Sequence, residues 1–155
     1  MENLQKILSE IIAEFIPNFM SVDEISRLSG GSSNESWKID INTKEDKKIL
    51  VFRRTPGGNL KDEESNNFVD ITDEAKVMDV AKDFDVPVPE ILKVINHKDI
   101  GKGFFMQFIK GETLGNRIVN NEGFKKVRPR LAEKCGEIIA NIHKIPISKF
   151  NNIRT

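Results

Sequence analysis

The sequence predicts an α+β fold, because its β-type segments follow one another along the chain instead of alternating with helices. Three short β-type runs lie between residues 21 and 54, and turn residues separate them. Helical periodicity marks segments before and after these runs, which gives the order β-β-β-α-β-β and then helices, behind a first helix. The 155 residues suffice for one hydrophobic core and not for two independent ones.

The composition argues against several classes of protein. Lys and Arg number 24, as do Asp and Glu, so the formal net charge is zero. General nucleic-acid-binding proteins instead carry a surplus of positive charge facing phosphates. The basic run 125–130 is predicted to be the exposed start of a helix. With one Cys the chain is no disulfide scaffold, and the isolated His97 and His143 predict no zinc site.

The first segment predicts an amphipathic helix that Pro17 ends. Apolar residues recur at i, i+3 and i+4 from Leu4 to Ile16, while charged side chains occupy the other faces. Those charges argue against a signal peptide, and no run approaches the roughly 18 apolar residues that cross a bilayer. We therefore expect a cytoplasmic protein that binds neither membranes nor nucleic acid.

The three β-type runs cover residues 22–28, 37–41 and 49–54. Turn residues divide them at 30–34 and 42–46, which is the spacing of two consecutive hairpins. We therefore predict a three-stranded antiparallel meander. Because successive strand residues point to opposite faces, Arg53 and Arg54 cannot both face the same side of the sheet.

A polar loop over residues 56–67 is predicted to lead into a helix of about four turns. The apolar positions of this helix are Phe68, Val77, Val80, Ala81 and Phe84. Pro87 and Pro89 prevent its continuation. The fourth and fifth strands are predicted over residues 91–95 and 104–109.

The rest of the chain is predicted to be helical, with a short segment over 114–119 and a longer helix that starts near Pro129 and closes before Pro146. Apolar positions of the longer helix are Leu131, Cys135, Ile138, Ile139 and Ile142. Because Cys135 lies on this apolar face, we expect a buried thiol in a reducing compartment and not a nucleophile.

Two features of the sequence could carry chemistry, and the first is a turn. It offers backbone N–H groups with little side-chain bulk, which suits a phosphate, although the same residue types suit any hairpin turn. The turn consists of Gly30, Gly31, Ser32, Ser33 and Asn34.

The second feature is Glu74, which lies on the apolar stripe of its predicted helix, three residues before Val77 and seven before Ala81. A carboxylate is costly there without a partner. It could lie in the first turns, where the helix dipole favours an acid, and reach solvent. Alternatively it pairs with a strand cation, for which Arg53 is the candidate. For Arg53 and Arg54 the alternative is a solvated basic pair at a strand end.

In order and spacing, several pieces of the chain resemble the smaller, N-terminal lobe of the protein-kinase-like fold in its aminoglycoside/choline phosphotransferase branch. The pieces are LSGGSSNESW at 28–37, LVFRRTPGG at 50–58, Glu74, VPVPE at 86–90 and GFFMQFIKG at 103–111. They span about residues 22–146. The sequence is most similar to the sub-branch that also occurs fused to acyl-CoA dehydrogenases.

The resemblance implies three parts of the chain. An amphipathic helix occupies residues 1–20, and a nucleotide-binding lobe with a five-stranded antiparallel sheet and one packed helix occupies residues 21–110. Residues 111–155 would then begin a helical C-terminal lobe that is incomplete here.

The resemblance also implies roles for individual residues in binding ATP. The turn 30–34 would cover the phosphates, Arg53 would hold the α- and β-phosphates, and Glu74 would fix Arg53 through an ion pair. Arg replaces the usual Lys and would offer a bidentate fork, with Arg54 as the one-residue alternative. A hinge over residues 106–109 would meet the adenine edge with its backbone. The hinge residues we expect to bind the nucleotide are Met106, Gln107 and Phe108.

The catalytic residues of the family are missing from this sequence. Family members carry a His-x-Asp loop with an Asn five residues after the Asp, and a later metal-binding Asp, beyond the long helix that ends here near His143. Asp83 and Asp85 are predicted to be a solvated helix end. Without a base and Mg²⁺ ligands, charge on the transferring phosphoryl group is not stabilised. We therefore expect no catalytic or metal-binding residue in this chain, and no activity from it alone.

These inferences predict the N-terminal fragment of an ATP-dependent phosphotransferase that acts on a small-molecule hydroxyl, with Mg²⁺ expected only in a complete two-lobed protein. The alternative is a catalytically inactive module that binds nucleotide or a partner and pairs with a separate helical lobe. Both predict that the last helix exposes apolar side chains such as Leu131.

Overall fold

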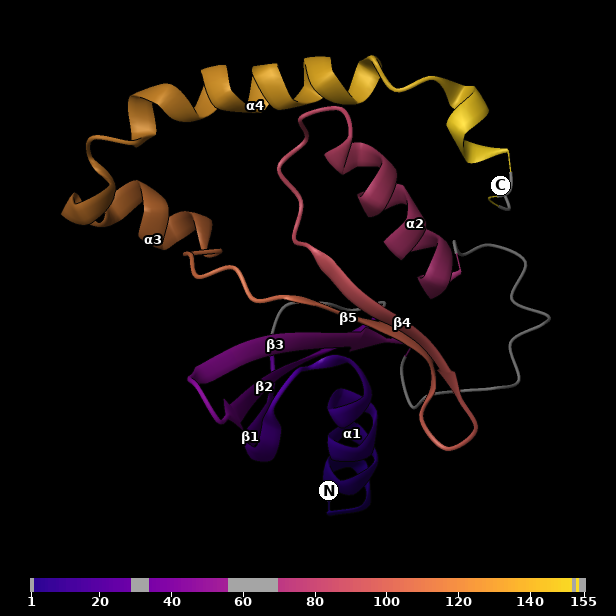
Figure 1. The fold of residues 1–155 in the computed structure, drawn as a ribbon. Helices are drawn as coiled ribbons and strands as arrows, with labels where there is room; N and C mark the ends of the chain where they lie inside the picture. The colour runs from indigo at the N-terminus through magenta and orange to yellow at the C-terminus, as the bar shows by residue number, and fades with distance from the viewer. Residues whose placement is uncertain (1, 29–33, 56–69, 152, 154–155) are drawn as a thin grey trace.

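The computed structural model describes residues 2–28, 34–55, 70–151 and 153, and a five-stranded sheet lies at its centre (Figure 1). The strands stand in the order β1-β2-β3-β5-β4, and each neighbouring pair is antiparallel. They are β1 (Phe19–Arg27), β2 (Glu35–Thr43), β3 (Lys47–Arg54), β4 (Ile91–His97) and β5 (Gly101–Gln107). The predicted α+β class is confirmed.

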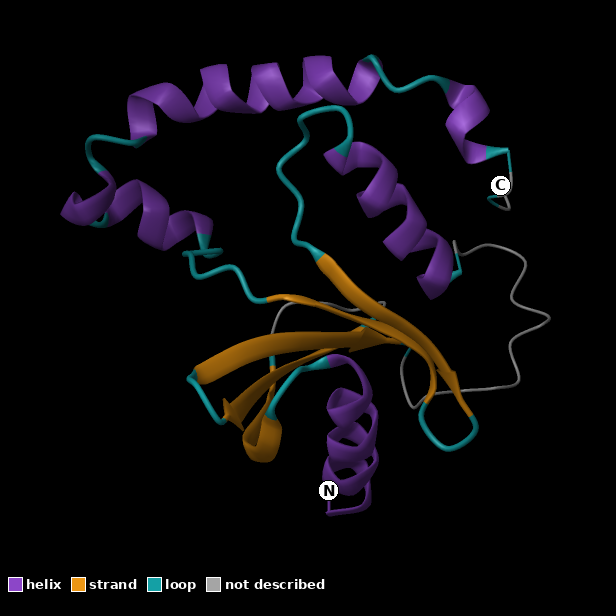
Figure 2. Ribbon diagram, viewed as in Figure 1, coloured by secondary structure: helices purple, strands orange, loops and turns teal. Residues whose placement is uncertain are grey.

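Helices lie on both faces of this sheet, as Figure 2 shows. The first helix covers one face, the second covers the other, and the remaining helices follow the last strand. They are α1 (Glu2–Phe15), α2 (Ile71–Lys82), α3 (Gly115–Asn120) and α4 (Arg128–His143), with 3₁₀ turns at Glu122–Phe124 and Ile147–Phe150.

The larger part of the core lies between α1 and the sheet. Leu8 and Ile12, four residues apart on α1, are fully buried and belong to one cluster with Phe52 of β3 and Phe105 of β5. The two phenylalanines face each other across neighbouring strands and stack with ring centroids 4.8 Å apart. The spacing of apolar residues on α1 is therefore that of a helix that covers a sheet.

A smaller cluster lies on the opposite face of the sheet, against α2. It consists of Ile71 and Ala75 of α2 and Phe104 of β5, with Met78, Ile91 and Met106 packed around them. Phe104 and Phe105 point to opposite faces because successive strand residues alternate. Strand β5 thus contributes one phenylalanine to each cluster.

The structure corrects the bounds of two predicted elements. Strand β5 begins at Gly101 and ends at Gln107, not at residue 109, because Leu50–Gln107 is the last pair it makes with β3. Helix α2 ends at Lys82, before the predicted Phe84, and Asp85 then adopts a positive φ of 57°. The predicted loop 56–67 and Phe68 lie outside the described residues.

Helices α3 and α4 contain no buried residue. Leu131, Ile139 and Ile142 are all exposed on α4, as predicted for a last helix without a partner. Cys135 is exposed as well, so the expectation of a buried thiol is wrong. The reason is that the apolar face on which Cys135 lies is not covered by the described part of the chain. No helix among the described residues has the length and apolar character needed to cross a membrane.

Candidate functional site

The candidate site is built around an ion pair between β3 and α2. Arg53 Nε lies 2.8 Å from Glu74 Oε1, and the two side chains are 26% and 33% exposed. Arg53 stands opposite Phe104 in the sheet, on the face that packs against α2. The predicted ion pair is therefore confirmed, and it supplies the partner that a carboxylate on an apolar stripe requires.

Two further polar side chains join this pair. Arg53 Nη1 donates a hydrogen bond to Ser36 Oγ at 3.1 Å, from the neighbouring strand β2. Asn34 Nδ2 donates to the second carboxylate oxygen of Glu74 at 3.3 Å. Glu74 thus joins the strand cation to the residue at the end of the predicted phosphate-binding turn. Gly30, Gly31, Ser32 and Ser33 of that turn lie outside the described residues.

Arg54 occupies the other face of the sheet, so the two arginines are separated as strand alternation requires. Its Nε lies 3.0 Å from Glu35 Oε2, and both side chains are 12% exposed. Its Nη1 donates to the backbone oxygen of Ile100 at 3.4 Å. Neither arginine is a solvated cation, so that interpretation is wrong. Of the two, Arg53 is the one beside Glu74, and its contact with phosphate stays a prediction.

The Arg53 guanidinium has donor capacity left over. Its Nε is used by Glu74 and its Nη1 by Ser36, whereas its Nη2 has no hydrogen-bond partner among the residues that the structure describes. A guanidinium carries five N–H donors in a fixed plane. The half-buried Arg53 can therefore keep both internal contacts and still donate to an anion at its free edge.

The predicted hinge residues follow Arg53 along the sheet. Met106 pairs with Val51 and so lies on the same face as Arg53, where it packs against the α2 cluster. The backbone N–H of Gln107 donates to Glu90 O at 2.8 Å and is therefore occupied. Phe108 follows the end of β5. Of the predicted hinge, the backbone of 108–109 lies past the strand pairing, while Met106 and Gln107 are still within it.

An anchor for α2 escaped the sequence reasoning. Asp70 caps this helix, because its side chain accepts hydrogen bonds from the backbone N–H and the hydroxyl of Thr72, and it lies 2.6 Å from Lys102 Nζ of β5. Burial alone would raise the pKa of Asp70, but the hydrogen bonds from Lys102 and Thr72 and the charge of Lys102 together lower it to about 2. The Asp directly before the helix was the available signal.

The structure gives no sign of a catalytic loop in the described residues. The tripeptide from His97 to Asp99 has the His-x-Asp form, but residue 104 is Phe and not Asn. It forms the turn between β4 and β5, where the Asp99 N–H donates to His97 Nδ1 at 3.2 Å. Across the described ranges, no three His, Cys, Asp or Glu side chains gather to hold a metal ion.

A five-stranded antiparallel sheet, a third-strand cation paired with the following helix, and helices after the last strand define a kinase-like N-terminal lobe. The APH family model, described as the phosphotransferase enzyme family, matches residues 24–154. The chain therefore belongs to the phosphotransferase enzyme family, as the sequence resemblance indicated. A search of curated proteins gave no significant match. Helix α1 precedes the matched region.

Proposed function

We propose that this chain supplies the nucleotide-binding lobe of an ATP-dependent phosphotransferase that transfers the γ-phosphoryl group to a hydroxyl of a small molecule. The observation that carries this proposal is the Arg53–Glu74 ion pair at 2.8 Å. In kinase-like enzymes a strand cation paired with a helix carboxylate holds the nucleotide phosphates. The pair is present here in a chain of the phosphotransferase family.

Arg53 would bind the α- and β-phosphates through its free edge. Glu74 and Ser36 hold the opposite edge of its guanidinium, so the cation is oriented before a ligand arrives. A pre-oriented donor loses less conformational entropy on binding than a free side chain does. Hydrogen bonds between a guanidinium and phosphate oxygens are charge-assisted and directional, which favours Arg over a residue without a fixed fork.

The adenine would lie at the other end of the same face. Because the Gln107 N–H is occupied by Glu90, the backbone of residues 108 and 109 is the better candidate to contact the adenine edge. The turn 30–34 would close over the phosphates from β1 and β2, as the resemblance implies. Asn34 supports this arrangement by its contact with the same carboxylate that holds Arg53.

The chemical step requires groups that this sequence does not provide. The His-x-Asp loop with its Asn and the later metal-binding Asp do not occur in residues 1–155. Glu74 already accepts from Arg53 and Asn34, so the described residues do not fit a Mg²⁺ ion. We propose that a helical lobe supplies the base and the Mg²⁺ ligands, and that this chain alone is inactive. The acyl-CoA dehydrogenase-associated sub-branch is our proposal for its place in the family.

The test is an ATP titration of the purified chain, followed by two-dimensional NMR because half a cleft binds weakly. We expect saturable binding, and a loss of about tenfold or more in affinity for Arg53→Met, since a hydrogen bond to a charged group contributes about 1.5–3 kcal/mol. Lys47→Met is the matched control. It also removes a strand β3 cation, but one that is 81% exposed and at the other end of the strand. A wild-type chain that binds no ATP would contradict the proposal.

A second candidate is the inactive binding module, and the exposed apolar side chains of α4 favour it. Leu131, Ile139 and Ile142 are 38%, 51% and 46% exposed, although each belongs to the helix's apolar stripe. Exposed apolar surface of this kind promotes association. A stable monomer in sedimentation velocity, with cooperative unfolding and normal ATP binding, would count against this candidate.

A further inference from the structure

The second buried ion pair of the sheet has no part in the proposed nucleotide contacts. Glu35 begins β2 and Arg54 ends β3, and they are paired in the sheet with side chains that are 12% exposed each. Glu35 also accepts from Trp37 Nε1 at 3.4 Å, and Arg27 of β1 lies 3.6 Å from it. One carboxylate therefore contacts side chains from three neighbouring strands.

This ion pair is directly adjacent to the candidate site in the sheet. Glu35 stands opposite Arg54, and the next pair along the two strands is Ser36 opposite Arg53. Because side chains alternate, the first pair lies on the α1 face and the second on the α2 face. A shift of one residue between β2 and β3 would move every side chain to the other face. The contact that fixes one pair therefore fixes the other.

We propose that Glu35, through Arg54, is a positioning residue for Arg53. The buried carboxylate holds the end of β3 in the register that places the Arg53 guanidinium between Ser36 and Glu74. Glu35 itself touches no ligand. This inference rests on the proposed nucleotide-binding function and adds to it a determinant on the opposite face of the sheet.

The third neighbour of this pair, strand β5, supports the same role. Arg54 stands opposite Gly103, and a Cβ built at Gly103 would lie 2.6 Å from the Arg53 backbone oxygen and 3.1 Å from Arg54 Cβ. Strand β5 thus approaches the two arginines more closely than a side chain would allow. Arg54 also reaches the backbone oxygen of Ile100 beyond β5's first residue. The end of β3 is therefore held from both of its neighbouring strands.

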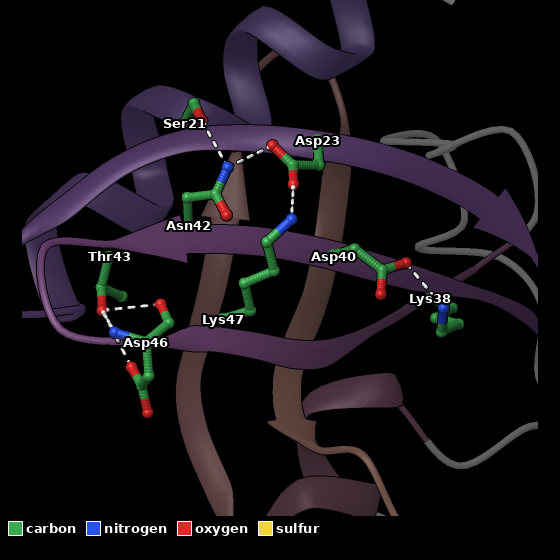
Figure 3. Close-up of polar contacts among 8 residues, drawn as sticks. All are labelled: Ser21, Asp23, Lys38, Asp40, Asn42, Thr43, Asp46 and Lys47. Atoms are coloured by element: carbon green, nitrogen blue, oxygen red, sulfur yellow. Dashed lines mark hydrogen bonds and ion pairs between the residues drawn. The ribbon is translucent and has the colours of Figure 1, made fainter.

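The test compares Glu35→Gln with a control carboxylate at the other end of the same strands. Asp23 of β1 is that control, because it accepts from Asn42 of β2 and pairs with Lys47 of β3 (Figure 3). Asp23→Asn removes a contact between three strands without touching the Arg53 end. Each variant is titrated with ATP and, separately, with adenosine, and urea unfolding verifies that it is folded.

We expect Glu35→Gln to weaken ATP binding about three- to tenfold and to leave adenosine binding unchanged, since contacting residues typically couple by this amount. Asp23→Asn is expected to change neither. If Glu35→Gln does not fold, Arg54→Lys replaces it. That variant keeps the charge but loses the fork between Glu35 and Ile100, so we expect a two- to threefold loss for ATP alone.

A measurement without nucleotide separates this inference from the proposed function. The side-chain Nε–H resonance of Arg53 reports its hydrogen bond to Glu74, and we expect Glu35→Gln to shift or broaden it while Asp23→Asn does not. An unchanged resonance and unchanged ATP affinity in a folded variant would overturn the positioning role, as would equal losses for ATP and adenosine. If Arg53→Met weakens ATP binding while Glu35→Gln does not, only the positioning role fails.

Discussion

At the scale of single residues, Glu74 joins two parts of the chain through its two carboxylate oxygens. Oε1 accepts from Arg53 and Oε2 accepts from Asn34, which lies 40 residues away in the sequence. Because each oxygen has its own lone pairs, the two contacts do not compete. A change at Glu74 is therefore expected to disturb both the strand cation and the end of the turn.

Gly103 has the strictest steric requirement beside the site. A Cβ there would lie 2.6 Å from the Arg53 backbone oxygen and 2.8 Å from the Phe52 ring, so Gly103→Ala forces the strands apart. We expect a loss of about 1–3 kcal/mol in the free energy of unfolding, measured with urea.

The matched control for Gly103→Ala is Gly136→Ala. Gly136 lies within α4, and a Cβ there has no heavy atom within 4 Å. Alanine is the better helix former, so this variant is expected to gain about 0.5–1 kcal/mol. Equal effects at the two positions would contradict the close approach of β5 to β3.

At the scale of elements, α2 positions Glu74 and is itself anchored by Asp70. The Asp70 carboxylate caps the first turn and pairs with Lys102 of β5 at 2.6 Å. Helix α2 also packs on Phe104 of β5, next to Arg53 in the sheet. The polar anchor and the apolar contact hold opposite sides of the same helix end. The distance from Glu74 to Arg53 therefore depends on both.

This anchor makes stability depend on acid pH. The pKa of Asp70 is lowered from 3.8 to about 2 in the folded chain, so the ionised carboxylate stabilises the fold above pH 3.8. That contribution is lost as the pH falls through the folded pKa of about 2. Because Asp70 is partly solvated, we expect Asp70→Asn to cost about 1 kcal/mol at pH 7.

Urea unfolding of both proteins from pH 7 to pH 2 checks this prediction. The difference between wild type and Asp70→Asn is expected to be constant near neutral pH and to shrink at the acid end of the series. A difference that stays the same down to pH 2 would show that the lost contact with Lys102 does not depend on the ionisation of Asp70.

At the scale of the whole molecule, α1 completes the lobe although it lies outside the family match. Leu8 is fully buried and belongs to the same cluster as Phe52 and Phe105. Without α1 the sheet would expose this apolar face, so residues outside the matched range 24–154 hold the matched part together. The family resemblance alone did not imply this role.

Leu8→Ala tests that role. Removing a fully buried leucine side chain leaves a cavity, and we expect a loss of about 2–5 kcal/mol in the free energy of unfolding. Ile139→Ala on α4 is the control, because Ile139 is 51% exposed, and its expected change is within about 0.5 kcal/mol. Urea unfolding of both variants gives the comparison. A small loss at Leu8 would mean that α1 is not part of the cooperative unit.

Local patterns in the sequence predicted much of the fold and the Arg53–Glu74 pair. Helical periodicity put Glu74 on the buried stripe, and strand alternation left one arginine for it. The Glu35–Arg54 pair was not predicted, because the register of β2 against β3 is set by the whole hairpin. The end of β5 was missed because it depends on where β3 stops pairing with it. Burial of Cys135 was wrongly predicted because an apolar stripe does not reveal what covers it.

The exposure of that same side chain offers a practical handle. Cys135 is the chain's one cysteine, and it lies exposed on α4 beside the apolar stripe. A maleimide dye would therefore modify a single known position without any engineered thiol. Its emission would report directly when a helical lobe or another polypeptide comes to rest on α4. The native sequence thus carries its own labelling site for finding out what completes this half of the enzyme.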